Sequence, residues 1–189
     1  YRGAAPDARY ALVRTENAAS ETLDEELTWA VGAEWAATNG IRLINSSLGY
    51  STFDNPADNH DYQDLDGNTT PIAQAARIAV NKGLLVVNSA GNEGNDPWKY
   101  ITAPADGDSV LAVGAVDSRK TLADFSSLGP TADGRVKPNV VAWGSRTSTI
   151  NERGEVIVGS GTSFSSPLVT GLAACLWQAH PTASAWDVH

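Results

Sequence analysis

Short apolar runs recur along this chain, separated in its first half by amphipathic stretches. The run at residues 84–89 is continuous, which is typical of a strand covered on both faces of a parallel sheet. Glycine, asparagine and proline near the ends of the runs supply turn signals. The predicted strands are residues 8–13, 41–46, 84–89, 110–116 and 139–142, with 155–158 as one half of a hairpin.

Two helices are predicted between these strands. Thr22 and Glu25 have the spacing of a capping box, and Asn39-Gly40 provides a stop signal. Thr70-Pro71 places a capping residue before a proline at the first helical position, and Gly83 ends that helix. The expected apolar face of the first helix consists of Leu23, Leu27, Ala30 and Val31.

The alternation of strands and helices predicts a three-layer α/β/α fold with a mostly parallel sheet. Ligands in such folds bind at the carboxyl ends of the strands. Residues 46–49 and 89–92 occupy two such ends, and residues 51–68 form an acidic, Asn-rich surface loop. The sequence therefore predicts a site where these two strand ends meet.

Composition narrows the classes of partner. The chain has 189 residues, a hydrophobic fraction of 42% and a formal net charge of −9, so we expect one domain. An acidic chain does not suit nucleic acid or an anionic membrane, and no apolar run is long enough to cross a bilayer. Cys175 is the only cysteine, and we expect it to be an inert core residue. Because the chain lacks methionine, we expect a mature, cut or partial product, whose first residues say nothing about secretion.

Candidate chemistry is concentrated in residues 159–171, where Ser163 falls at the transition from a loop to a helix. The first backbone N–H groups of a helix lack internal partners, so a hydroxyl there lies beside donors suited to a developing oxyanion. Thr162 is the expected N-cap, and Pro167 falls near the first turn. The alternative is a Gly/Ser loop that only caps a core helix. That helix is expected to bury Leu168, Leu172, Cys175, Leu176 and Ala179.

The complete string G-T-S-x-S-x-P-x-V-x-G at residues 161–171 resembles the nucleophile motif of the subtilisin-like serine peptidases, the subtilases. The resemblance implies that Ser163 is the nucleophile of an endopeptidase that acts through an acyl-enzyme. Residues 89–94 are similar to the family's A-A-G-N-x-G segment, which implies that Asn92 donates to the oxyanion. From the sequence alone, Asn92 could instead be a turn residue that tolerates positive φ.

Residues 44–49 resemble the family's I-N-x-S-L-G segment. This resemblance implies a substrate pocket between two walls, with the extended peptide bound as an added strand. One wall would consist of Ser47, Leu48 and Gly49, and the other of Ser89, Ala90 and Gly91. Trp143 departs from the family pattern, which usually has proline before glycine at that point.

The family's D-[ST]-G and H-G-T-H segments, which carry the other triad members, do not occur in these residues. Residues 1–8 resemble the G-x-A-P-x-A stretch that follows the catalytic histidine. His60, His180 and His189 lack the family context. We therefore expect residues 1–189 to be the C-terminal two-thirds of a subtilisin-like catalytic domain. Its N-terminal segment would be another chain, disordered, or outside this sequence.

Two classes of function stay open. The first is a serine endopeptidase acting on peptides or proteins, and the second is a catalytically silent peptide-binding fragment or pseudoenzyme without the triad Asp and His. No cofactor is expected to be required, although Asp64-Leu65-Asp66-Gly67-Asn68 has alternating oxygen side chains and a glycine, as calcium loops do. A solvated loop is the alternative. Family resemblance implies an extracellular or cell-envelope location.

Overall fold

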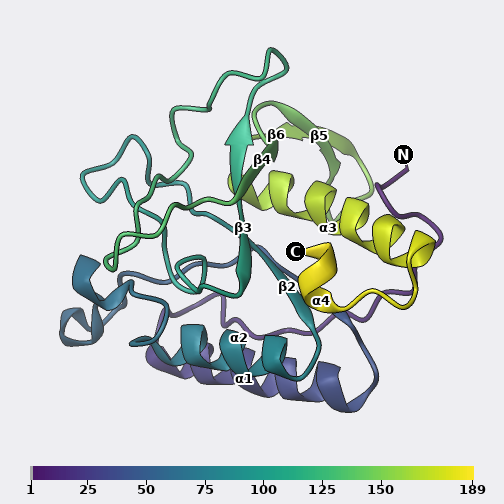
Figure 1. Ribbon diagram of the computed structural model, residues 1–189. Coiled ribbons are helices and arrows are strands. Elements are labelled where there is room, and N and C mark those ends of the chain that lie inside the picture. The colour runs from purple at the N-terminus through teal and green to yellow at the C-terminus, as the bar shows by residue number, and fades with distance from the viewer. Residues whose placement is uncertain (1) are drawn as a thin grey trace.

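The computed structural model describes residues 2–189, so Tyr1 lies outside the described residues. Helices and strands alternate as far as β2, the second strand of the main sheet. Two further strands, a hairpin and two helices complete the chain (Figure 1). The elements are α1 Leu23–Thr38, β1 Leu43–Ser46, the 3-10 turns η1 Pro56–Asp58 and η2 Tyr62–Asp64, α2 Pro71–Asn81, β2 Leu85–Ser89, β3 Val110–Val116, β4 Val140–Trp143, β5 Thr147–Ile150, β6 Val156–Gly159, α3 Thr162–Ala179 and α4 Ala185–Val188.

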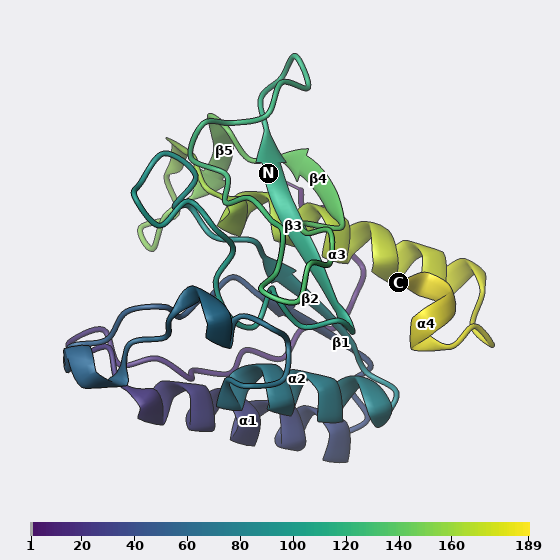
Figure 2. The same cartoon turned by 60° about the vertical axis from the view of Figure 1, so that its left-hand side comes forward.

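The central sheet is parallel, with the strand order β1-β2-β3-β4. Helices α1 and α2 lie together on one face and α3 on the other, as the two views in Figures 1 and 2 show. The expected three-layer α/β/α architecture is confirmed. Strands β5 and β6 form the expected hairpin, which is antiparallel and leads into α3.

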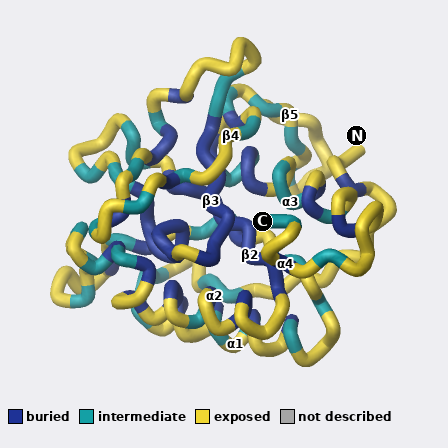
Figure 3. The backbone as a smooth tube through the Cα atoms, viewed as in Figure 1, coloured by how far each residue is buried: buried dark blue, intermediate teal, exposed yellow. Residues whose placement is uncertain are grey.

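Each face of the sheet has its own core. Between the sheet and helices α1 and α2, side chains such as Trp29, Leu65 and Ile72 pack with Val86. Between the sheet and α3, Trp177 packs against Val87 and Leu111. Strand β2 is buried along its whole length, as its continuous apolar run predicted, and β2 and β3 form the dark centre of Figure 3. The sheet therefore holds the loops at the carboxyl ends of β1 and β2 on a rigid base.

The helix boundaries follow the local sequence signals. Thr22 and Glu25 form the capping box of α1, and the Thr70 side chain accepts a hydrogen bond from the Ala73 N–H at the start of α2. Gly40 and Gly83 follow the two helices with positive φ, as helix stops require. No helix in residues 2–189 is long and apolar enough to cross a membrane.

The strand predicted at residues 8–13 is wrong. These residues belong to no strand or helix, and the Leu12 side chain is 96% exposed. The apolar face predicted for α1 is also wrong in part, because Leu27 and Val31 are 54% and 65% exposed while Trp29, Ala33 and Ala36 are buried. This helix has apolar residues around most of its circumference, and the packing of α2 selects the buried side.

The face predicted for α3 is rotated in the same way. Leu168, Leu172 and Leu176 are exposed, and Cys175 is an exposed free thiol, so its expected role as a core residue is wrong. Apart from Trp177, the buried residues of α3, which contacts all four strands of the sheet, are small. The buried residues of α3 are Thr162, Ser165, Ser166, Gly171, Ala173 and Trp177.

Candidate active site

Ser163 is the second residue of α3, as the loop-to-helix transition predicted. Its backbone N–H has no acceptor within the helix, because the first turn of an α-helix leaves its donors unpaired. Its Oγ lies 3.5 Å from the Ser47 carbonyl oxygen, and the Ser47 hydroxyl donates to the Ser163 carbonyl at 3.2 Å. Ser163 is half-buried, and its hydroxyl therefore lies against the carboxyl end of β1.

Asn92 lies beside the same helix start. Its side-chain oxygen accepts hydrogen bonds from the Thr162 N–H at 2.8 Å and from the Thr162 hydroxyl at 3.1 Å. Because an N–H can only donate, the atom that faces it must be the amide oxygen. The amide NH₂ of Asn92 consequently points away from Thr162, where it can donate to another group.

Thr162 is not the N-cap that the sequence predicted. Gly161 occupies that position, and the Thr162 hydroxyl instead bonds the loop after β2. It donates to Gly91 O at 3.1 Å and accepts from Gly91 N at 3.3 Å, in addition to its contact with Asn92. Sequence reasoning assigned Thr162 to its own helix and missed this link between the helix start and the loop after β2.

Strand β1 contributes another positioning residue that the sequence analysis did not single out. The Asn45 side-chain oxygen accepts from the hydroxyls of Ser166 and Thr170, each at 2.9 Å. The Ser165 hydroxyl donates to Ala142 O at 3.1 Å, which ties the same helical turn to β4. Asn45 lies within the I-N-x-S-L-G segment, so the motif already contained this signal.

The two expected pocket walls lie side by side. Strands β1 and β2 are parallel neighbours, so residues 47–49 and 89–91 leave the same edge of the sheet. The buried Asn88 side chain donates to Leu48 O at 2.9 Å and to Ser89 O at 2.8 Å, which joins the two walls. The structure thus brings Ser47, Leu48, Gly49, Ser89, Ala90 and Gly91 together near Ser163.

No histidine or carboxylate in residues 2–189 is bonded to the Ser163 hydroxyl. His60 is paired with the buried Glu26 of α1 at 2.5 Å, on the opposite face of the sheet. Burial lowers the pKa of His60, but the hydrogen bond and charge of Glu26 outweigh that effect and raise the pKa overall. His180 follows α3, and the ring of His189 lies against Trp186, so neither reaches the site.

The candidate calcium loop at residues 64–68 is held by hydrogen bonds of its own. Asp66 accepts hydrogen bonds from Asn68 N, Thr69 N and the Thr69 hydroxyl, so its oxygens serve its own loop. The one group of three metal-capable side chains within residues 2–189 lies elsewhere and consists of Glu16, Glu21 and Glu25. Calcium binding at residues 64–68 stays a prediction.

A helix that presents a serine beside an oriented asparagine amide, at the edge of a parallel α/β/α sheet, suits a serine hydrolase. The family model described as "Subtilase family" matches residues 1–189, and the chain therefore belongs to the subtilase family.

Curated relatives support this assignment. Subtilisin DY from Bacillus licheniformis is 37% identical over 158 residues, which cover 83% of this chain and 50% of that protein. The thermophilic serine proteinase of Bacillus sp. (strain AK1) is also 37% identical, over 92% of this chain and 37% of that protein. The chain thus spans half or less of the length of these two relatives.

Solved structures agree with the fold. The self-cleaved protease domain of PatA superposes with a TM-score of 0.67 at 31% identity, covering 82% of this chain and 52% of that one. A cold-adapted subtilisin-like serine proteinase superposes with the same TM-score at 25% identity, covering 86% of this chain and 52% of the other.

Proposed function

We propose that this chain forms the nucleophile-bearing part of a subtilisin-like serine endopeptidase. The observation that carries the proposal is the pairing of Ser163 at the start of α3 with an Asn92 amide whose oxygen is fixed by Thr162. Ser163 Oγ would attack the peptide carbonyl, lose its proton to a base and form an acyl-enzyme as the amine leaves. Water would then hydrolyse the ester and restore the serine.

The oxyanion of that step would accept hydrogen bonds from the Asn92 NH₂ and the Ser163 N–H. Both donors belong to a rigid framework, because α3 is bonded to β1 through Asn45 and to the loop after β2 through Thr162. The substrate is a peptide or protein segment that extends between residues 47–49 and 89–91. Strand addition of this kind uses main-chain hydrogen bonds and tolerates many sequences.

We also propose that an N-terminal segment supplies the histidine and aspartate of the triad and completes the domain of which residues 1–189 are part. Strand β1 is at the edge of the sheet, and a cavity of about 340 Å³ separates it from residues 11–16. An unpaired strand edge is a ready site for another strand. The greater length of the relatives supports the same proposal.

The rival function is a catalytically silent peptide-binding module. The observation that favours it is the lack of any base bonded to Ser163 within residues 2–189. We favour the peptidase, because peptide binding alone has no physical need of a fixed asparagine amide beside a helix-start serine. Action in the extracellular space or the cell envelope, with no cofactor required for catalysis, forms part of the same proposal.

Labelling with a fluorophosphonate probe tests the proposal. The chain alone should label poorly, and the protein that includes the N-terminal segment should label at Ser163, with Ser163→Ala as the control. Asn92→Ala should slow labelling by about 100-fold or more, the usual effect of losing one oxyanion donor. A folded, complete protein that does not react would support the silent binding module instead.

A further inference from the structure

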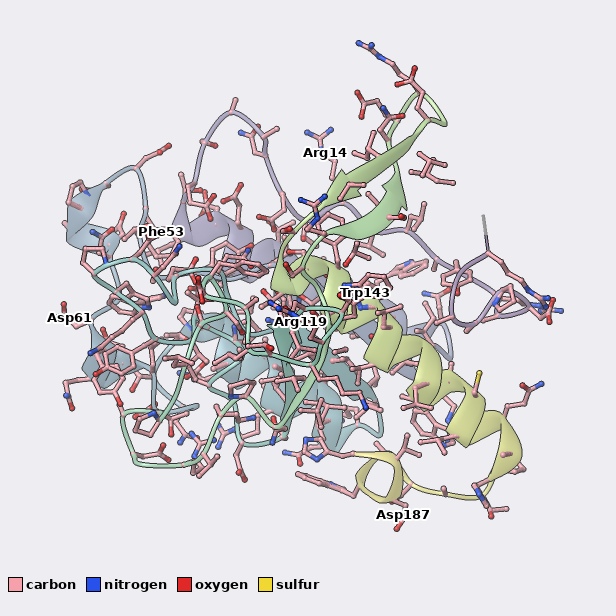
Figure 4. All side chains as sticks on the ribbon, turned by 90° about the horizontal axis from the view of Figure 1, so that it is seen from above. Arg14, Phe53, Asp61, Arg119, Trp143 and Asp187 are labelled. Atoms are coloured by element: carbon pink, nitrogen blue, oxygen red, sulfur yellow. The ribbon has the colours of Figure 1, made fainter. Side chains whose placement is uncertain are left out.

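A proline interrupts the hydrogen bonding of α3 at the proposed nucleophile. Helix α3 begins beside Trp143 at the end of β4, as Figure 4 shows, and Pro167 lies inside it, four residues after Ser163. In an α-helix the N–H of each residue donates to the carbonyl oxygen four residues earlier, so residue 167 would be the partner of Ser163 O. Proline has no N–H, and its ring crowds that same carbonyl. The Ser163 carbonyl therefore needs a donor from outside the helix.

Ser47 supplies this donor from the carboxyl end of β1. Its hydroxyl donates to Ser163 O at 3.2 Å, across 116 residues of sequence. The contact is reciprocal, because Ser163 Oγ lies 3.5 Å from the Ser47 carbonyl oxygen. Both serines are half-buried, and Ser47 directly follows a strand of the central sheet. The sheet thus provides the hydrogen bond that the helix cannot make at this residue.

Asn45 orients the Ser47 hydroxyl. Its Nδ2 donates a long hydrogen bond to Ser47 Oγ at 3.4 Å, which leaves the hydroxyl proton to point at Ser163 O. The oxygen of the same amide accepts from the hydroxyls of Ser166 and Thr170, each at 2.9 Å. The end of β1 therefore holds α3 at two levels, at the nucleophile and farther along the helix.

The main chain on both sides of Ser163 is also held. The Thr162 N–H donates to the Asn92 side chain at 2.8 Å, and the Phe164 N–H donates to Gly161 O at 3.1 Å. The bond to Ser163 O lies between these two contacts. It acts on the residue that carries both the attacking hydroxyl and one of the two proposed oxyanion donors.

We propose that Ser47 is a positioning residue for the nucleophile, because its hydroxyl replaces the backbone donor that Pro167 lacks and so fixes the main chain of Ser163. The inference rests on the proposed peptidase function. The Ser47 side chain in this role acts through Ser163 and not on the substrate. Loss of the bond would let the Ser163 carbonyl turn, and a small displacement of a nucleophile or an oxyanion donor slows the reaction.

A double-mutant cycle between Ser47→Ala and Pro167→Ala tests the proposal in the protein that includes the N-terminal segment. A peptidyl fluorophosphonate labels Ser163, and the readouts are the limiting rate kinact and the half-saturating concentration KI. Ser47→Ala should lower kinact about 10-fold and change KI by less than about twofold. In the Pro167→Ala background, where residue 167 gains an N–H for Ser163 O, Ser47→Ala should lower kinact by less than about threefold.

Three further variants sharpen the test, with urea unfolding to confirm that each protein is folded. Ser47→Thr keeps the hydroxyl and should restore most of kinact. Asn45→Ala removes the group that orients this hydroxyl and should lower kinact by about threefold. Pro181→Ala is the matched control, because Pro181 is exposed and follows the end of α3. In that background Ser47→Ala should have its full effect.

The outcomes separate this inference from the proposed function. A raised KI with unchanged kinact in Ser47→Ala would show that the side chain only lines the pocket. Equal losses of kinact in the presence and absence of Pro167 would show that the hydroxyl does not replace the missing donor. Either result would overturn the inference and leave the peptidase function standing. No labelling of the folded parent protein would refute the peptidase function and, with it, the positioning role.

Discussion

Replacement of Thr162 by valine should loosen the link between α3 and the loop after β2. Valine preserves the shape of threonine but removes the hydroxyl that contacts Gly91 N, Gly91 O and the Asn92 side chain. A hydroxyl has a single proton, so it donates one hydrogen bond at a time while it accepts another. The substitution therefore removes two hydrogen bonds and leaves the polar backbone of the buried Gly91 without that partner.

The size of the effect follows from these contacts. A lost hydrogen bond costs about 1 kcal/mol, and a buried backbone group left unpaired costs about 1–3 kcal/mol, so Thr162→Val should lower the free energy of unfolding by about 2–4 kcal/mol. Thr162→Ser keeps the hydroxyl and loses one methyl group, at a cost of about 1 kcal/mol. The serine variant therefore separates the loss of hydrogen bonds from the loss of packing.

Urea unfolding of the complete protein measures both variants, with the slope of the transition as a check that the unfolded states are comparable. The rate of fluorophosphonate labelling provides a second readout, because Asn92 is oriented partly by the same hydroxyl. Labelling should slow in the valine variant and stay near the parent rate in the serine variant. Equal destabilisation by serine and valine would refute the assignment of Thr162 as a hydrogen-bonded link.

Three further predictions concern titration and metal binding. Burial raises the pKa of Asp106 to about 6, above its unfolded value, so the free energy of unfolding should fall as the pH rises from about 4 to 7. Asp106→Asn should reduce this fall by about 3 kcal/mol, as measured by urea unfolding at several pH values. An equal dependence of the unfolding free energy on pH in parent and variant would contradict this prediction. The raised pKa of His60 means that its pairing with Glu26 stabilises the fold fully below about pH 6.5, and that this contribution is lost as the pH rises through the folded-state pKa. The loss of unfolding free energy caused by His60→Gln should therefore become smaller with rising pH in the same assay. If the loop at residues 64–68 binds calcium, the ion should raise the melting temperature and Asp66→Ala should abolish the shift, whereas no shift with calcium would exclude the site.

The parts of the fold that the sequence predicts well are governed by local chemistry. The uninterrupted apolar run of β2 can be satisfied only by burial on both faces, and the Thr70-Pro71 and Gly83 signals act within one turn of α2. The position of Ser163 at a helix start follows from the same local signals. The assignment of Asn92 to the oxyanion needed the family resemblance, because the residue by itself also suits a turn.

Features that depend on contacts between distant segments could not be predicted. Periodicity identifies an apolar stripe on a helix but not the neighbour that covers it, so the stripe with Leu27 and Val31 was assigned to the core although Trp29 fills that place. The hydroxyl of Thr162 had two possible partners, its own helix and a loop 71 residues away, and only the fold decides between them.

The error at residues 8–13 has a physical explanation. The first residues of this chain, 4–13, contact both helix layers. Ala4 lies against Gly171 of α3, where an added Cβ would strike it, and Val13 lies against Gly32 of α1, where an added Cβ would touch it at 3.3 Å. Residues 4–13 therefore run from α3 to α1 past the β1 edge of the sheet, and the cavity of about 340 Å³ separates them from that strand. Strands pair at about 4.8 Å, so one added strand between the segment and β1 would give residues 8–13 the partner that a strand requires. Pairing with a strand of the proposed N-terminal segment would therefore explain why residues 8–13 have the apolar pattern of a strand.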